Sequence, residues 1–113
     1  MLRVTFYEDS RRRLSSFVAE GHTELAEHGE DIVCAAISAI LQAARLGLEQ
    51  HAAAKLVVRQ QSGDMELTIA PEEREREDVR AILGTALLAC SAIAGQYPDA
   101  VTVRRETESS IGQ

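Results

Sequence analysis

The sequence predicts an α+β fold in which two long helices pack on a mixed or antiparallel sheet. Short runs of alternating apolar and polar residues occur in pairs, which is typical of hairpins. Each pair is followed by a long stretch whose apolar residues recur at helical spacing. The predicted order is therefore β-β-α-β-β-α-β. A chain of 113 residues, 45% of them hydrophobic, is expected to form one domain over residues 1–113.

The first two strands are predicted at residues 2–7 and 14–20. Polar residues at 8–10 form the turn between them, and the three arginines at 11–13 open the second strand of the hairpin. We expect these arginines to be a solvated turn rather than a binding patch.

The first long helix is predicted from Ile32 to about Gln50, with Asp31 as its N-cap. This stretch is apolar on most faces, which predicts a buried central helix. Cys34 and Ser38 are four residues apart and therefore lie on one face of that helix.

The second half repeats the pattern. Strands are predicted at residues 55–60 and 65–70, with a turn at 61–64 between them. A second helix follows from about Glu73 to Gln96, with Tyr97 as the last member of its apolar face. A final strand is expected at residues 100–106.

The charge balance limits the classes of function. The net charge is −6 and the pI is near 5.0, which argues against a nucleic-acid-binding protein. An acidic surface fits a cytoplasmic protein with a basic partner. No uninterrupted apolar run of membrane-spanning length is present, and the first residues lead directly into a strand pattern. We therefore expect neither a membrane span nor a signal peptide.

Cys34 is the candidate nucleophile. With Asp31 as the cap, the thiol falls in the first helical turn, where unpaired backbone N–H groups and the helix dipole lower the pKa of a thiol. The same N–H groups would receive the oxyanion that forms on an attacked carbonyl. Cys90 lies in the middle of the second helix among apolar neighbours and is expected to be structural, because burial raises the pKa of a thiol.

His22 is the candidate proton-transfer partner, because it ends a strand beside Gly21 and the following connection returns toward Cys34. His28 is the alternative base, although it falls inside the predicted loop at residues 23–30. His51 lies at the far end of the helix, too distant from Cys34 to take part.

A metal site formed by His22, His28 and Cys34 is the third alternative, but nothing in the sequence fixes its geometry. We expect no metal and no cofactor.

The two remaining polar positions have open roles. Asp31 either orients His22 or only caps the helix. Ser38 is either a packing hydroxyl or a donor that orients the site. A dyad of Cys34 and His22 is the simplest interpretation, because no acid close in sequence completes a triad.

The step Gly21-His22 and the helix start Asp-Ile-Val-Cys-Ala-Ala-Ile-Ser at residues 31–38 resemble the ribosomal-processing cysteine protease (Prp) family. Members carry a Gly-His step, a variable loop and an Asp-Ile-Val-Cys-Ala-Ala-x-Ser helix start. The resemblance extends over essentially the whole chain. The loop at residues 23–30 is more acidic than the resemblance leads one to expect.

The resemblance implies that Cys34 is the nucleophile and His22 its proton-transfer partner, with Gly21, Asp31 and Ser38 at the other characteristic, substrate-binding positions. It further implies a homodimer that removes an N-terminal extension from a large-subunit ribosomal protein, cutting after a Phe. Two other hypotheses stay open from the residues alone. One is a non-catalytic dimeric module that binds ribosomes or a partner protein, and the other is a redox sensor in which Cys34 and Cys90 form a disulfide.

Overall fold

A computed structural model describes residues 1–21, 28–61 and 63–108, and for residues 28–31 it describes the backbone alone. The elements in chain order are β1 (Leu2–Glu8), β2 (Leu14–Glu20), α1 (His28–Leu46), the π-helical turn η1 (Gly47–His51), β3 (Leu56–Gln61), β4 (Asp64–Ile69), the 3₁₀ turn η2 (Pro71–Glu73), α2 (Glu77–Gln96) and β5 (Val101–Thr107). This order confirms the predicted β-β-α-β-β-α-β arrangement.

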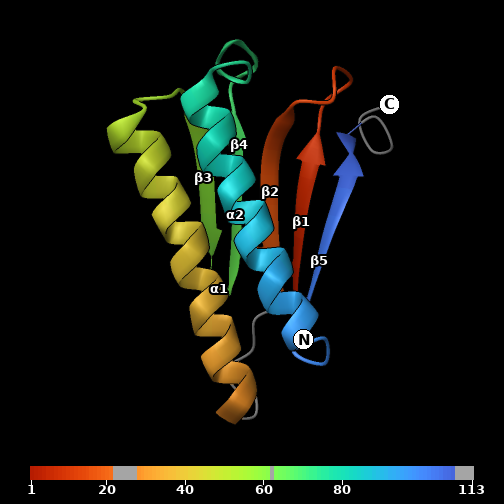
Figure 1. Cartoon of the computed structure of the whole chain (residues 1–113). Helices are drawn as coiled ribbons and strands as arrows, with labels where there is room; N and C mark the ends of the chain where they lie inside the picture. Colours follow the sequence, from red (N-terminus) through yellow and green to blue (C-terminus); the bar gives the residue numbers. More distant parts are fainter. Residues whose placement is uncertain (22–27, 62, 109–113) are drawn as a thin grey trace.

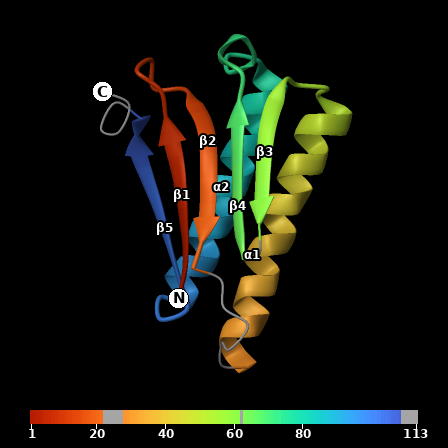
Figure 2. The same cartoon turned by 180° about the vertical axis from the view of Figure 1, so that it is seen from behind.

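The five strands form one mixed sheet in the order β3-β4-β2-β1-β5 (Figure 1). The neighbours β3–β4, β4–β2 and β2–β1 are antiparallel, whereas β5 runs parallel to β1. Both helices lie on the same face of the sheet, and the view from behind shows the other face uncovered (Figures 1 and 2). The fold is thus a two-layer α+β domain, as the pattern predicted.

The core lies between the sheet and the helices. Alternate residues of the strands point into it, because successive side chains of a strand face opposite sides of the sheet. Phe6 and Phe17 are fully buried at opposing positions of β1 and β2, with ring centroids 5.5 Å apart. Helix α2 contributes its buried residues at helical spacing: Val79, Leu83, Ala86 and Cys90.

Helix α1 differs from its prediction in two respects. It begins at His28, three residues before the predicted cap Asp31. It is also buried on one face only, since Ile32 is 60% exposed and Leu46 is 51% exposed. The prediction of a helix buried on most sides was wrong, because two helices on one face of a sheet each leave an outer side uncovered.

Helix α2 begins at Glu77 rather than Glu73, because residues 71–73 form a separate 3₁₀ turn after β4. Tyr97 lies after the last turn of α2 and is 50% exposed, so it does not belong to the predicted apolar face. The segments Ile32–His51 and Glu77–Gln96 have mean hydropathies of 1.5 and 1.4 and are long and apolar enough to cross a membrane. In this structure each of them buries one face against the sheet.

The connection between β1 and β2 is built around a buried carboxylate. Asp9 is 6% exposed and accepts hydrogen bonds from the backbone N–H groups of Arg11 and Arg13, at 2.9 and 3.0 Å. Its Oδ2 also pairs with the guanidinium groups of Arg13 and Arg74, at 2.9 and 3.2 Å. The three arginines are therefore not uniformly solvated as predicted, since Arg13 is a partner of Asp9.

Burial raises the pKa of Asp9, but the hydrogen bonds from the two backbone N–H groups and the two guanidinium groups outweigh that effect and lower the pKa to about 2. Arg74 belongs to the segment after β4 and also donates to the carbonyl of Ile69 at 2.9 Å. Asp9 thus ties the first hairpin to the entry of α2.

Candidate active site

Gly21 follows β2 directly and has a φ of +85°. A Cβ atom at this position would lie 2.5 Å from the backbone oxygen of Met1. Both the positive φ and the close approach require glycine. The end of β2 is therefore held against the start of β1, and the chain leaves the sheet at this point toward His22.

Cys34 lies in α1 and is 4% exposed. It is the seventh residue counted from His28, so it falls in the second turn of the helix rather than in the first. The unpaired N–H groups of a helix are its first four, and the effect of the dipole falls off within one turn. The predicted activation of Cys34 by free N–H groups, and their use as its oxyanion donors, are therefore corrected: those groups precede Cys34 in the chain.

The candidate base His22 lies outside the described residues, as do the side chains of Asp31 and His28. His28 is nevertheless the first residue of α1 and not part of a loop, which corrects the predicted loop at residues 23–30. Among the described residues no group of three or more His, Cys, Asp or Glu side chains is arranged to hold a metal ion.

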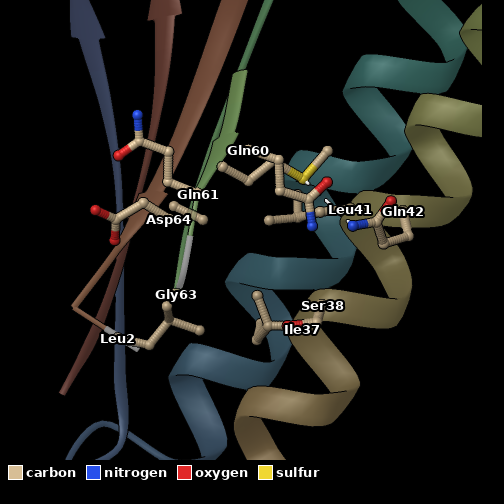
Figure 3. Close-up of a pocket in the computed structure, with 11 residues that line it drawn as sticks. Leu2, Ile37, Ser38, Leu41, Gln42, Gln60, Gln61, Gly63 and Asp64 are labelled. Atoms are coloured by element: carbon tan, nitrogen blue, oxygen red, sulfur yellow. Dashed lines mark hydrogen bonds between the residues drawn. The ribbon is translucent and has the colours of Figure 1, made fainter. Parts of the chain in front are cut away.

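One pocket connects the cysteine helix with the end of β2. It has a volume of about 110 Å³, and Figure 3 shows helix side chains on one side facing strand residues on the other. We call it the Ser38 pocket, and its lining residues are Leu2, Ala19, Ile37, Ser38, Leu41, Gln42, Gln60, Gln61, Gly63, Asp64 and Met65.

The position of the Ser38 pocket follows from helical and strand spacing. Ile37, Ser38 and Leu41 lie three, four and seven residues after Cys34 and therefore share its face of α1. On the opposite wall, Ala19 precedes Gly21 by two residues on β2. The pocket thus lies one helical turn from the cysteine and beside the strand end that leads to His22.

Ser38 is exposed and lines the pocket, in agreement with its predicted place on the Cys34 face. Sequence reasoning missed the second wall, which the β3–β4 hairpin contributes. One signal was present: Gln42 is a polar residue four positions after Ser38 on an otherwise apolar helix. Its Nε2 contacts Sδ of Met65 on β4 at 3.8 Å, which joins the two walls.

Carboxylates line a second hollow beside the Ser38 pocket. Glu20, Asp64 and Glu66 line an adjoining hollow of about 270 Å³, which shares Gln61, Asp64 and Met65 with the Ser38 pocket. Arg59 is the only cation among the described residues that line this hollow. On the same uncovered face, the pKa of Tyr7 is raised by burial and by the carboxylates of Glu106, Glu20 and Glu66. Three carboxylates and one arginine give the hollow a local charge of −2, and Arg3 lies 4.0 Å from Glu20 at its border.

Cys90 has the opposite environment from that of a reactive thiol. It is fully buried in α2, and burial raises its pKa to about 11. The structural role predicted for Cys90 is thereby supported, and Cys34 remains the candidate nucleophile of the two.

The model of the family described as cysteine protease Prp matches residues 1–102. No protein of curated function matches the chain significantly. Among solved structures, the chain resembles SMU.848 from Streptococcus mutans, with 27% identity and a TM-score of 0.86 over 95% of this chain and 98% of that one.

Two further structures share the fold. Both are of the essential ribosomal processing protease Prp from S. aureus, one with a covalently linked product peptide and one with a substrate peptide. Their identities to this chain are 20% and 19%, and their TM-scores are 0.81 and 0.84. In each case 93% of this chain and 99% of the other are covered.

Proposed function

This chain belongs to the cysteine protease Prp family, and we propose that it removes an N-terminal extension from a large-subunit ribosomal protein with Cys34 as nucleophile and His22 as proton-transfer partner. The observation that carries this proposal is the family match over residues 1–102, which includes Gly21, His22 and Cys34. The Ser38 pocket between the cysteine helix and the end of β2 supports it, because a peptide side chain can enter there.

The proposed chemistry is that of a cysteine–histidine dyad. The thiol proton of Cys34 passes to His22, and Sγ attacks the scissile carbonyl carbon. His22 then gives the proton to the departing amine, which leaves a thioester on Cys34. Water attacks the thioester, the carboxyl product is released, and the thiol is restored.

The Ser38 pocket is the proposed seat of the residue that precedes the scissile bond. Its walls include the apolar side chains of Leu2, Ile37, Leu41 and Met65, which suits the Phe that the family resemblance implies. Gln61 ends the edge strand β3 and lines the same pocket. An extended peptide added along that edge would reach the pocket.

The carboxylates beside the pocket supply the rest of the recognition. A ribosomal protein is basic, and Glu20, Asp64 and Glu66 line the hollow that adjoins the pocket. Opposite charge raises the rate of encounter as well as the affinity. The proposal includes a cytoplasmic homodimer, as the family resemblance implies, and sedimentation at equilibrium tests the dimer.

Cleavage of the extended ribosomal protein tests the function. The wild-type chain is expected to shorten it, and Cys34→Ala and His22→Ala are expected to abolish the reaction while the far-ultraviolet circular dichroism stays unchanged. Cys90→Ala is the control, because it removes the other thiol and should retain cleavage. Cleavage by Cys34→Ala would end the assignment.

A non-catalytic dimeric binding module is the second candidate, since a thiol that is 4% exposed also fits a purely structural cysteine. This candidate predicts that the wild-type chain binds the extended ribosomal protein without shortening it. It also predicts that Cys34→Ala binds equally well.

A further inference from the structure

A second concave surface lies at the opposite end of the sheet from Gly21. Residues 9–13 join β1 to β2 at one end of the hairpin, and Arg3 pairs with Glu20 at the other. The seven residues of β2 separate these ends by about 20 Å. The surface at the connection therefore does not belong to the candidate active site.

This surface is a groove of about 830 Å³ between the β1–β2 connection, α2 and β5. We call it the arginine groove, and its lining residues are Arg11, Arg12, Arg13, Leu14, Glu75, Glu77, Arg80, Ala81, Gly84, Leu87, Leu88 and Arg105. Five arginines and two glutamates give it a local charge of +3, in a chain whose net charge is −6.

Three of these arginines have no counter-ion among the described side chains. Arg13 is paired with Asp9 and Glu75, and Arg105 is paired with Glu8. The side chains of Arg11, Arg12 and Arg80 are exposed, and none of them forms an ion pair or hydrogen bond within the described part of the chain. The groove therefore keeps unsatisfied positive charge.

The backbone of Arg11, Arg12 and Arg13 is held in a hydrogen-bonded turn. The carboxylate of Asp9 accepts hydrogen bonds from the N–H groups of Arg11 and Arg13. The backbone carbonyl of Asp9 accepts one from the N–H of Arg12 at 2.9 Å. Asp9 itself is fixed by Arg74 from the segment after β4. A turn that is ordered in advance loses less conformational entropy when a partner binds.

The floor of the groove is apolar and open. Leu88 is 73% exposed, more than any other large hydrophobic residue among those described, and Leu87 is partly buried beside it. Gly84 lies one turn before Leu88, and a Cβ atom at that position would meet no heavy atom within 4 Å. The missing side chain leaves room where an apolar group of a partner can lie.

We propose that the arginine groove binds an acidic peptide segment of another protein, with an apolar side chain of that segment seated over Gly84 and Leu88 and carboxylates on Arg11, Arg12 and Arg80. None of the described residues that line the groove has an aromatic side chain on which a base could stack. Glu75 and Glu77 interrupt the positive charge, which disfavours a continuous phosphate backbone. The basic substrate proposed for the active site is repelled here, so the acidic segment is a separate partner.

Fluorescence anisotropy with a labelled peptide of alternating Glu and Leu residues tests the proposal. The matched pair Arg80→Glu and Arg104→Glu reverses one exposed arginine in the groove and one outside it. We expect Arg80→Glu to weaken binding by about tenfold or more and Arg104→Glu to change it little. Added salt should weaken binding by the wild-type chain.

A second matched pair tests the apolar floor. Gly84→Leu places a side chain in the groove, whereas Gly95→Leu places one on the same helix away from it, and a Cβ at either position meets nothing within 4 Å. Both exchanges favour the helix, so neither should unfold the chain. We expect Gly84→Leu to abolish binding of the Glu-Leu peptide and Gly95→Leu to retain it.

Several results would overturn the proposal. One is equal peptide binding by the two members of either pair. Another is tighter binding of a single-stranded RNA of equal charge than of the peptide. A third is a salt-sensitive self-association that Arg80→Glu removes, because the groove would then hold a second copy of the chain. Cleavage of the extended ribosomal protein by Arg80→Glu should match wild type, which separates this proposal from the proposed function.

Discussion

The two cysteines occupy different environments although both are buried. Cys34 lies one helical turn from an open pocket, whereas Cys90 lies on α2 within the hydrophobic core. If Cys34 is the nucleophile, the pH profile of its alkylation should have a midpoint below about pH 8. The pKa of a free thiol is higher, at about 8.5. Burial raises the pKa of Cys90 to about 11, so its alkylation should be negligible there.

Pulses of iodoacetamide followed by peptide mass spectrometry would measure both profiles, with Cys34→Ala as the control for assignment. Equal midpoints for the two thiols near their ordinary value would contradict an activated Cys34. A Cys34–Cys90 disulfide formed by mild oxidant would instead favour the redox hypothesis.

Asp9 is the residue from which a pH effect on stability follows. Its pKa in the folded chain, about 2, lies below its ordinary value of 3.8. A lowered pKa stabilises the folded state above about pH 4, and that contribution is lost as the pH falls toward 2. The shift corresponds to about 2 kcal/mol at neutral pH.

Asp9→Asn should therefore lower the free energy of unfolding by about 2 kcal/mol at pH 7, with a difference from wild type that shrinks between pH 4 and pH 2. Urea denaturation at several pH values measures it. Asp99→Asn, at an exposed position, is the control and should change stability little. A difference that is independent of pH would show that the charge of Asp9 is not the cause.

At the scale of elements, α1 carries both the candidate nucleophile Cys34 and one wall of the Ser38 pocket. Ser38 points into the pocket, whereas Ala39, the next residue, is exposed and does not line it. Ser38→Met should fill the pocket and reduce kcat/KM for the extended ribosomal protein by about tenfold. Ala39→Met is the matched control with the same added volume, and steady-state kinetics compare the two. Equal effects of the two exchanges would remove the pocket from substrate recognition.

The strands were predictable and the start of α1 was not. All five strands lie within one residue of their predicted bounds at each end, because alternating side chains mark a half-buried strand. At the start of α1, Gly29 lowers helix propensity, and Asp31 is a good cap by type. The helix nevertheless extends back to His28, against both local preferences.

Only the helix wall of the Ser38 pocket could be predicted from the sequence. Helical spacing placed Ser38 on the face of Cys34, but the opposite wall depends on the pairing of β4 with β2. Strand order is a property of the whole sheet, and no local pattern in the sequence contains it. For the same reason, the pairing of Asp9 with Arg74, 65 residues apart, was not foreseen.

Across the whole molecule, charge is divided between two regions. Three carboxylates line the hollow beside the Ser38 pocket, and five arginines line the groove at the other end of the sheet. Because the chain is acidic overall and its proposed substrate basic, kcat/KM should fall as ionic strength rises. A short uncharged peptide with the same cleavage sequence is the control. Cleavage rates of the extended ribosomal protein that do not depend on salt would argue against electrostatic attraction.

The parallel pairing of β1 with β5 has a consequence for biosynthesis. Strand β1 precedes the other strands of this sheet in the chain, yet the neighbour that completes its hydrogen bonding begins at Val101. Such distant pairing slows folding, because nearly the entire chain must be closed into a loop before the contact exists. Until β5 pairs with it, β1, which supplies Leu2 to the pocket, is an open edge of the sheet. The sheet is complete only once β5 has paired with β1.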